Sequence, residues 1–297
     1  MKAIFLILMT TVFTSGAYAQ NLQSITAKNA KVEKIESGYS FTEGPAVAPN
    51  GEIYFTDQNN DAIYIWNEKT GIRKFDVEAE RSNGQYFDNA GNLIACADYR
   101  NKLIRITLDG KKTVLADQYD GKHLNGPNDV WVNPKSGNIY ITDSYYHRPW
   151  WPEGYKQEQD CRAVYCIYPD GRIVRVIDDL KMPNGIVGTP DGKTLYVSDI
   201  QDGKTWKYVM NPDGALSGKT FFAGEGSDGM TIDNAGNVYL TNRGVSVFNS
   251  KGEKIGMIEV PERPANVALG GKSKKTLFIT ARTSVYTMPM RVKGVTK

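Results

Sequence analysis

The sequence predicts an all-β fold, a six-bladed β-propeller of four-stranded blades whose ring is closed by the N-terminal strand. The first observation is a repeat, in which a turn containing Gly or Asp precedes an alternating apolar strand that ends in Thr, Ser or Ala and usually Asp. It occurs six times, at residues 49–57, 88–98, 135–143, 191–199, 233–242 and 271–280. The second is the period: the closing Asp or Asn residues of the first five copies are 41, 45, 56 and 43 residues apart, typical of propeller blades.

A second hairpin after most repeats is the third observation. These hairpins cover residues 62–75, 102–115, 163–177 and 206–222, and three of them turn at an Asp-Gly pair. Asp-Gly suits a turn because both residues tolerate a positive φ. Two hairpins make a four-stranded blade, and no helical periodicity is long enough to compete with this interpretation.

The last repeat lacks an outer strand, because the chain has only one more strand, residues 284–288, after it. Segment 31–37, which precedes the first repeat, can supply the missing strand. Pairing the two ends of the chain removes a sheet edge that would otherwise be exposed. We therefore expect a single propeller domain over residues 20–297.

The N-terminal residues resemble a secretory signal peptide. A charged start is followed by an apolar run from Ala3 to Phe13, and Ala17-Tyr-Ala19 matches the cleavage pattern. We expect cleavage after Ala19, so that residues 1–19 are removed and the product is periplasmic or secreted. No other stretch approaches the roughly 20 apolar residues that span a bilayer, so no membrane association is expected after cleavage.

The composition excludes several kinds of chemistry. The chain of 297 residues is 40% hydrophobic and 23% charged, which is typical of a globular protein, and its net charge of +3 comes without a dense basic run. Nucleic acid is therefore not an expected partner. His123 and His147 are the only histidines, which excludes an HExxH zinc site. The three cysteines form no CxxC motif, and we expect Cys161 and Cys166 to be free thiols.

An insertion explains the interval of 56 residues. It spans residues 144–159 and is rich in aromatic side chains, among them Tyr146. Such a loop can line the mouth of a propeller channel, where Tyr146 and His147 would contact substrate. It can equally be a surface flap that covers the blade edges, and the sequence does not decide between the two.

The inner strands carry the candidate site, because the innermost strand of every blade runs beside the propeller axis. Five of the six begin at a Glu, Asn or Asp: Glu43, Asn83, Asn128, Asn184 and Asp228. Two carboxylates and three amides without His or Cys form a hard, all-oxygen donor set. It suits Ca²⁺ best, with Mg²⁺, Mn²⁺ or Zn²⁺ as alternatives. A divalent cation would also offset the cost of burying two carboxylates.

Two other interpretations compete with the metal site. Asn-Gly and Asp-Gly pairs are common turn formers, but Glu43 precedes Gly-Pro and Asn128 precedes Asp, which does not fit turns alone. Residues 57–68 resemble an EF-hand loop, but Ala62 replaces the required Gly and the alternation after it predicts a strand.

The motifs at these positions resemble the SMP-30/gluconolactonase family, also called regucalcin, over nearly the whole mature chain. They are Phe41-Thr-Glu-Gly-Pro45, Leu124-Asn-Gly-Pro-Asn-Asp129, Met182-Pro-Asn-Gly185, Ser227-Asp-Gly-Met230 and Leu277-Phe-Ile-Thr-Ala281. The resemblance implies a six-bladed propeller that opens sugar lactones with one divalent metal in its channel. The implied ligands are Glu43, Asn128, Asn184 and Asp228, four residues that the axis argument also selects. The resemblance is closer to bacterial gluconolactonases than to the animal proteins, whose sugar-contacting Arg is replaced here by Gly126.

The same resemblance implies a mechanism, in which Asp228 is the general base and the metal polarises the lactone carbonyl. Asp129 is a possible second carboxylate, and Asn83 and His123 are candidate substrate contacts. The substrate would be a small sugar lactone. A related metal-dependent esterase or organophosphate hydrolase, or a non-catalytic calcium-stabilised propeller that binds a sugar or a protein, are the alternatives. The oligomeric state has no signature in the sequence.

Overall fold

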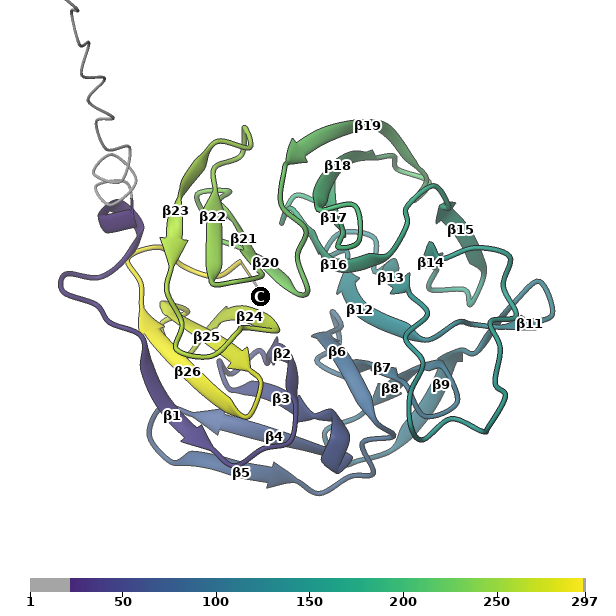
Figure 1. Ribbon diagram of the computed structural model, residues 1–297, viewed down its shortest axis with the longest axis horizontal. Helices are drawn as coiled ribbons and strands as arrows, with labels where there is room; N and C mark the ends of the chain where they lie inside the picture. The colour runs from purple at the N-terminus through teal and green to yellow at the C-terminus, as the bar shows by residue number, and fades with distance from the viewer. Residues whose placement is uncertain (1–21, 296–297) are drawn as a thin grey trace, which may run out of the picture.

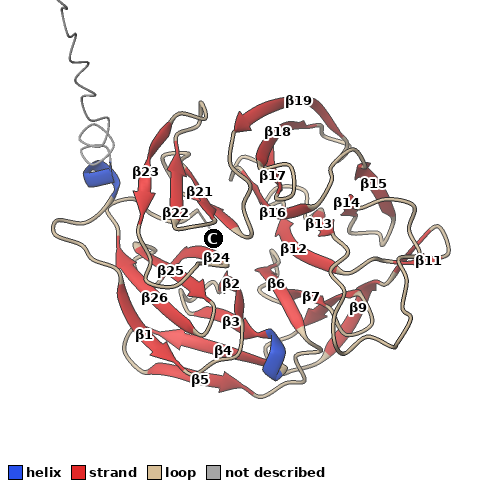
Figure 2. Cartoon of the chain, viewed as in Figure 1, coloured by secondary structure: helices blue, strands red, loops and turns tan. Residues whose placement is uncertain are grey.

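Six four-stranded antiparallel sheets surround a central axis in the computed structural model, which describes residues 22–295 (Figure 1). The fold is therefore the predicted six-bladed propeller. The proposed signal peptide, residues 1–19, lies outside the described residues. Among the described residues, helix is limited to one turn at residues 22–25 and the 3₁₀ helix η1 (Gln58–Asn60) (Figure 2). Within residues 22–295 no helix is long and apolar enough to cross a membrane.

Each of the first three blades is built from strands that are consecutive in the chain. The first contains β2 (Thr42–Val47), β3 (Ile53–Asp57), β4 (Ala62–Asn67) and β5 (Gly71–Phe75). The second contains β6 (Ser82–Phe87), β7 (Leu93–Ala97), β8 (Lys102–Ile106) and β9 (Lys112–Ala116). After a two-stranded hairpin of β10 (Gln118–Tyr119) and β11 (Lys122–His123), the third contains β12 (Pro127–Val132), β13 (Ile139–Asp143), β14 (Ala163–Ile167) and β15 (Ile173–Ile177).

The next two blades follow the same order. The fourth contains β16 (Pro183–Gly188), β17 (Thr194–Asp199), β18 (Lys204–Met210) and β19 (Leu216–Ala223). The fifth contains β20 (Met230–Ile232), β21 (Val238–Thr241), β22 (Val245–Phe248) and β23 (Lys254–Ile258). Strand β4 begins at Ala62, as expected from the alternation that argued against an EF-hand loop.

The ring closes through the sixth blade, as predicted. This blade contains β24 (Asn266–Gly270), β25 (Thr276–Ala281), β26 (Ser284–Pro289) and, as its outer strand, β1 (Glu33–Ser37). Glu33 pairs with Thr287 in the antiparallel register between β1 and β26. The two ends of the chain thereby hold each other, and β1 covers the edge of β26 and becomes the outer strand of the blade.

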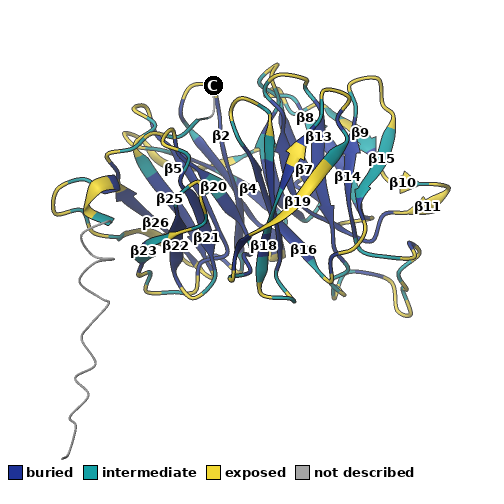
Figure 3. Cartoon of the chain, turned by 90° about the horizontal axis from the view of Figure 1, so that it is seen from above, coloured by how far each residue is buried: buried dark blue, intermediate teal, exposed yellow. Residues whose placement is uncertain are grey.

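Burial falls from the axis outward (Figure 3). All six residues of β2, β12 and β16 are buried, whereas most of β19 is exposed. The inner strands are buried on both faces because neighbouring blades pack against them, so the polar side chains at their starts are buried as well. All three cysteines are free, as expected; Cys166 lies within β14 and Cys161 precedes that strand.

The Asp that closes each repeat has a structural role. In three blades it accepts hydrogen bonds from two backbone N–H groups of the loop that enters the inner strand. Asp57 accepts from Ser40 and Phe41, Asp143 from Asn125 and Gly126, and Asp199 from Lys181 and Met182. Backbone donors that would otherwise be buried without partners are thus satisfied. The Asp ties the start of the first strand of a blade to the end of its second strand.

Candidate functional site

A β-bulge lies at the start of the inner strand in each of the first four blades. The pairing register shifts between Glu43 and Ala46, and at the equivalent positions of β6, β12 and β16. A bulge re-aims side chains and is frequent next to functional sites. It explains how Glu43, Asn83, Asn128 and Asn184, which lie at the same end of their strands, come to face the axis.

The glycines after the site residues permit close approach between neighbouring blades. A Cβ on Gly84 would lie 2.5 Å from the Asn128 carbonyl oxygen, and one on Gly185 would lie 2.7 Å from that of Asp228. No real Cβ fits at such distances, so Gly is required there. The Asn-Gly pairs of the inner strands are therefore packing features of the ring and are not turns.

A cavity of about 200 Å³, here called the mouth, opens at this end of the channel. Four of the five predicted axial residues line it, together with Tyr146 of the insertion. The complete lining is Phe41, Glu43, Asn83, Asn128, Tyr146, Arg148, Ile200, Asp228, Arg263, Pro264, Ala265 and Arg282. The fifth axial residue, Asn184, adjoins the mouth, because its Nδ2 donates to Asp228 Oδ1 at 2.8 Å and to the Tyr146 hydroxyl at 2.9 Å.

Glu43 and Asp228 are two buried carboxylates that affect each other's charge. Burial raises the pKa of Glu43 well above its usual range, and the charge of Asp228 raises it further. Burial also raises the pKa of Asp228, while the hydrogen bond from Asn184 and the nearby arginines oppose that increase. Glu43 Oε2 accepts from the backbone N–H of Gly44 at 2.8 Å and from Asn266 Nδ2 at 3.2 Å.

Asn266 is a site residue that the sequence argument missed. It begins β24 and is the sixth inner-strand counterpart, one residue later than the alignment to Ala265 suggested. Its side chain is buried and positions Glu43 from the neighbouring blade. The Asn in Ala265-Asn-Val was the available signal.

Three arginines of the mouth were also missed. Arg148 comes from the insertion, Arg263 precedes β24, and Arg282 lies in the turn between β25 and β26. Arg148 pairs with the buried Asp98 at 2.5 Å, and its guanidinium lies 5.3 Å from the Tyr146 ring centroid. Arginines in irregular loops carry no periodicity, so a pattern search has nothing to find.

One part of the insertion lines the mouth, and another part packs against the blades. Tyr146 and Arg148 line the mouth, whereas Trp151 is buried and donates its indole N–H to the Asp98 carbonyl at 3.0 Å. A Cβ on Gly126 would lie 3.3 Å from Trp151, so the indole occupies space beside the position at which the animal relatives were expected to carry an Arg.

Asp129 does not line the mouth. It lies in a second cavity of about 40 Å³ farther along the inner strands, here called the inner cavity. Its Oδ1 accepts from the Val130 N–H at 3.0 Å and its Oδ2 from the Ile186 N–H at 3.4 Å. Burial raises the pKa of Asp129 to about 7. The reason is the bulge of β12: Asn128 and Asp129 both lie within the register shift between Pro127 and Val130, and their side chains line different cavities.

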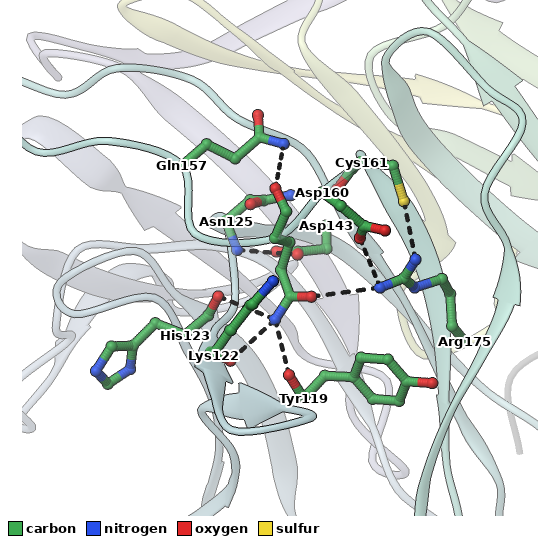
Figure 4. A network of polar contacts seen from close by, with 10 residues as sticks. Tyr119, Lys122, His123, Asn125, Asp143, Gln157, Asp160, Cys161 and Arg175 are labelled. Carbon is green, nitrogen blue, oxygen red and sulfur yellow. Dashed lines mark hydrogen bonds and ion pairs between the residues drawn. The ribbon is translucent and has the colours of Figure 1, made fainter.

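The two histidines also lie away from the mouth. His123 belongs to β11 and lines a separate aromatic pocket with Tyr99 and Trp150. Only its backbone takes part in the network around Gln159, and its ring points away from that network (Figure 4). His147 is exposed, and its ring contacts Trp151 edge-on at 6.2 Å. The geometry supports a substrate contact for neither histidine.

The donor set fits a hard divalent cation. Within residues 22–295 no three His, Cys, Asp or Glu side chains are grouped as metal ligands. The candidate ligands are two carboxylates and two amides, so they are not a group of that kind. Glu43 and Asp228 are buried close enough to raise each other's cost of ionisation, which a cation would offset. Asn128 and Asn184 offer neutral oxygens beside them.

Comparison with known proteins identifies one family. A family model described as "SMP-30/Gluconolactonase/LRE-like region" matches residues 41–283. The chain is similar to a gluconolactonase of Zymomonas mobilis, at 26% identity over 93% of this chain and 86% of that protein. It is 32% identical to the lactonase drp35 of Staphylococcus aureus over 82% of this chain and 76% of that one. The solved structure of a gluconolactonase from Xanthomonas campestris superimposes with a TM-score of 0.82 at 28% identity, covering 89% of this chain and 91% of that chain.

Proposed function

The chain belongs to the SMP-30/gluconolactonase/LRE-like family, and we propose that it is a divalent-metal-dependent hydrolase that opens the ring of a sugar lactone. Glu43, Asn128, Asn184 and Asp228 would hold the cation, with Ca²⁺ preferred. The observation that carries the proposal is the pair of buried carboxylates at the end of an open channel mouth, flanked by amides from two further blades. Relatives named as lactonases support the choice of substrate class.

The reaction consumes one water molecule. The water oxygen bonds to the lactone carbonyl carbon, the ring ester C–O bond breaks, and the ring oxygen leaves as a hydroxyl. At neutral pH the resulting acid is released as a carboxylate and one proton. A bound divalent cation would supply Lewis acidity toward the carbonyl oxygen.

Asp228 is the proposed general base. Its Oδ1 is held by Asn184, and among the described residues no hydrogen bond engages its Oδ2, which can accept a proton from water. Tyr146 also orients Asn184, because the Tyr146 hydroxyl accepts a hydrogen bond from Asn184 Nδ2. Asn83 lines the mouth opposite Asp228 and is placed to bind sugar hydroxyls. Phe41 and Ile200 provide apolar walls for the sugar ring.

A metal-return experiment tests the proposal. Protein stripped with chelator is given Ca²⁺, Mg²⁺, Mn²⁺ or Zn²⁺, and proton release from D-glucono-1,5-lactone is followed with subtraction of spontaneous hydrolysis. We expect no enzymatic rate without metal, recovery with the preferred ion, and a rise in melting temperature with the same ion. Binding that stabilises the fold without opening any lactone would favour the non-catalytic alternative, and turnover of an aryl ester or organophosphate alone would favour the esterase alternative.

We also propose that the protein acts outside the cytoplasm, on the evidence of its first 19 residues alone. N-terminal sequencing of the protein recovered from its native compartment would test this, with Gln20 expected as the first residue.

A further inference from the structure

The mouth carries more positive charge than the opening of a neutral lactone requires. Glu43 and Asp228 are balanced when a divalent cation is bound, and the buried Asp98 balances Arg148. Arg263 and Arg282 remain. Within residues 22–295 neither guanidinium forms an ion pair.

Arg263 and Arg282 act electrostatically on the buried Asp228, whose charge a bound cation would balance, but within residues 22–295 no carboxylate forms an ion pair with them. Glu262 precedes Arg263, but its carboxylate pairs with Lys34 at 3.2 Å and accepts hydrogen bonds from the Tyr286 hydroxyl at 2.7 Å and the Thr283 N–H at 3.2 Å. Glu262 is not among the residues that line the mouth. The side chains of Arg263 and Arg282 are exposed at the rim, where they are accessible to a ligand.

The arginines occupy opposite sides of the cavity. Arg263 and Arg282 belong to the sixth blade and Arg148 to the third, which lie three blades apart in a ring of six. Glu43 belongs to the first blade and Asp228 precedes the inner strand of the fifth, so the two carboxylates flank the sixth blade, which carries Arg263 and Arg282. A sugar whose lactone group reaches the carboxylates therefore lies within the reach of guanidinium groups.

Arg282 occupies a backbone position that suits glycine. Its φ is +50° in the two-residue turn between β25 and β26. Non-Gly residues rarely adopt this conformation. The corresponding turns after β3 and β7 also hold left-handed residues, Asp61 and Asn101, so the backbone is a feature of this turn, and Arg282 is the turn residue that lines the mouth.

From these observations we propose that the substrate is an anionic sugar lactone, one that bears a phosphate or carboxylate group away from the lactone carbonyl. Arg263 and Arg282 bind this group. Guanidinium groups suit both anions because they donate paired N–H groups to two oxygens. The inference rests on the proposed lactonase function and makes it more specific.

Two matched substrate pairs test this. The first pair is D-glucono-1,5-lactone and 6-phospho-D-glucono-1,5-lactone; the second is D-glucono-1,4-lactone and D-glucaro-1,4-lactone, which differ by a carboxylate at C6. We expect kcat/KM for at least one anionic member to exceed that of its neutral partner about tenfold or more at low ionic strength. This preference should shrink as salt is added.

The variants Arg263→Gln, Arg282→Gly and their combination locate the effect. In the double variant the anionic-to-neutral ratio of kcat/KM should fall at least about tenfold. Arg282→Gly relieves the backbone strain, so its fold should be retained or stabilised, which separates loss of recognition from loss of structure. Arg172→Gln, in the turn between β14 and β15, removes the same charge outside the mouth and should leave the ratio unchanged.

The outcomes are distinct. A wild-type ratio of one or less in both pairs, or a ratio that the double variant does not change, overturns the anionic-substrate inference while gluconolactone turnover keeps the proposed function. If no lactone is opened, the proposed function fails, and calorimetry still compares 6-phosphogluconate with gluconate as ligands. Equal or absent binding of the two would overturn recognition of the anionic group as well. A preference for only one anionic member identifies phosphate or carboxylate as the group recognised.

Discussion

The two cavities lie at different levels of the same propeller channel but differ in lining and chemistry. The mouth, at one end of the inner strands, has two carboxylates, three arginines and an opening to solvent. The inner cavity, farther along, is lined mainly by aliphatic residues and by Gly294 and Val295, the last residues that the structure describes. In one ring of strands, the end at the mouth therefore carries the candidate site, and the region around the inner cavity contributes mainly to packing.

The buried polar groups differ in the same way. Asp129, in the inner cavity, accepts two backbone N–H groups, whereas Glu43 and Asp228, at the mouth, face each other across blades. Gln85 lies beside Asp129, and neither atom of its amide has a hydrogen-bond partner among the described residues. A cavity of about 40 Å³ has room for one ordered water that would satisfy it.

The largest effect should come from the carboxylates of the mouth. Glu43→Gln and Asp228→Asn should each reduce kcat/KM more than about 100-fold, because even outer-sphere partners of a metal cost 10 to 100-fold. Each change also removes a buried charge, so the metal-free variants should melt at or above the wild-type temperature. Steady-state kinetics and thermal melts with and without Ca²⁺ check both statements. Full activity in either variant would remove that residue from the proposed site.

A change at the inner cavity should have the opposite signature. A Cβ on Gly294 would lie 2.1 Å from the Leu269 carbonyl oxygen, so Gly294→Ala forces the backbone to move. We expect a loss of about 1–3 kcal/mol in the free energy of unfolding and a KM within about twofold of wild type. Denaturant titration and kinetics on the same preparation measure the two quantities. A large rise in KM with unchanged stability would show that the cavities are not separate.

Asp98 pairs with Arg148 of the mouth, and its protonation should make activity pH-dependent. Burial raises its pKa to about 6, although Arg148 opposes the shift. Above that pH the carboxylate is charged and holds Arg148; below it the ion pair is lost, so kcat/KM should fall as pH decreases through 6. Asp98→Asn should lower kcat/KM about tenfold above pH 6 and remove this step.

The titration of Asp98 should also affect the stability of the fold, with the opposite dependence on pH. Because the folded pKa lies above the ordinary value near 4, the folded state binds more protons between about pH 4 and 6, and this group's contribution to stability is lost as pH rises through that window. Denaturant titrations at pH 4.5 and 7 should show a smaller difference in Asp98→Asn than in wild type. An unchanged difference would mean that Asp98 titrates normally.

The smallest effect should follow Asp129→Asn. The Asn retains an oxygen that accepts from the Val130 N–H, and the side chain does not reach the mouth. We expect kcat/KM within about threefold of wild type. A loss near 100-fold would instead make Asp129 the general base and Asp228 only a ligand.

The fold was predictable because it is periodic. Strands and turns leave signals that recur from blade to blade, and the axial positions follow from the same register. The closing pair of β1 and β26 follows from the strand that the last repeat lacks. The alignment was off by one residue only at Asn266, where the preceding segment differs from the other blades.

The rest of the mouth was not predictable, for a physical reason. Arg148, Arg263 and Arg282 lie in loops whose paths depend on tertiary packing, and nothing in their spacing distinguishes them from surface arginines. His123 was selected because it is close in sequence to Asn128, but the β10–β11 hairpin carries it to another pocket. The separation of Asn128 from Asp129 needs the bulge of β12, which the sequence does not reveal.

The pairing of β1 with β26 also bears on how the chain folds. Glu33 and Thr287 pair although almost the whole described chain separates them, so closure of the ring is among the most non-local events available to this chain. Contacts at such sequence separation are slow to form because loop closure must precede them. We therefore expect the sixth blade to form last. Until it forms, the other blades would make an open ring whose end strands are exposed.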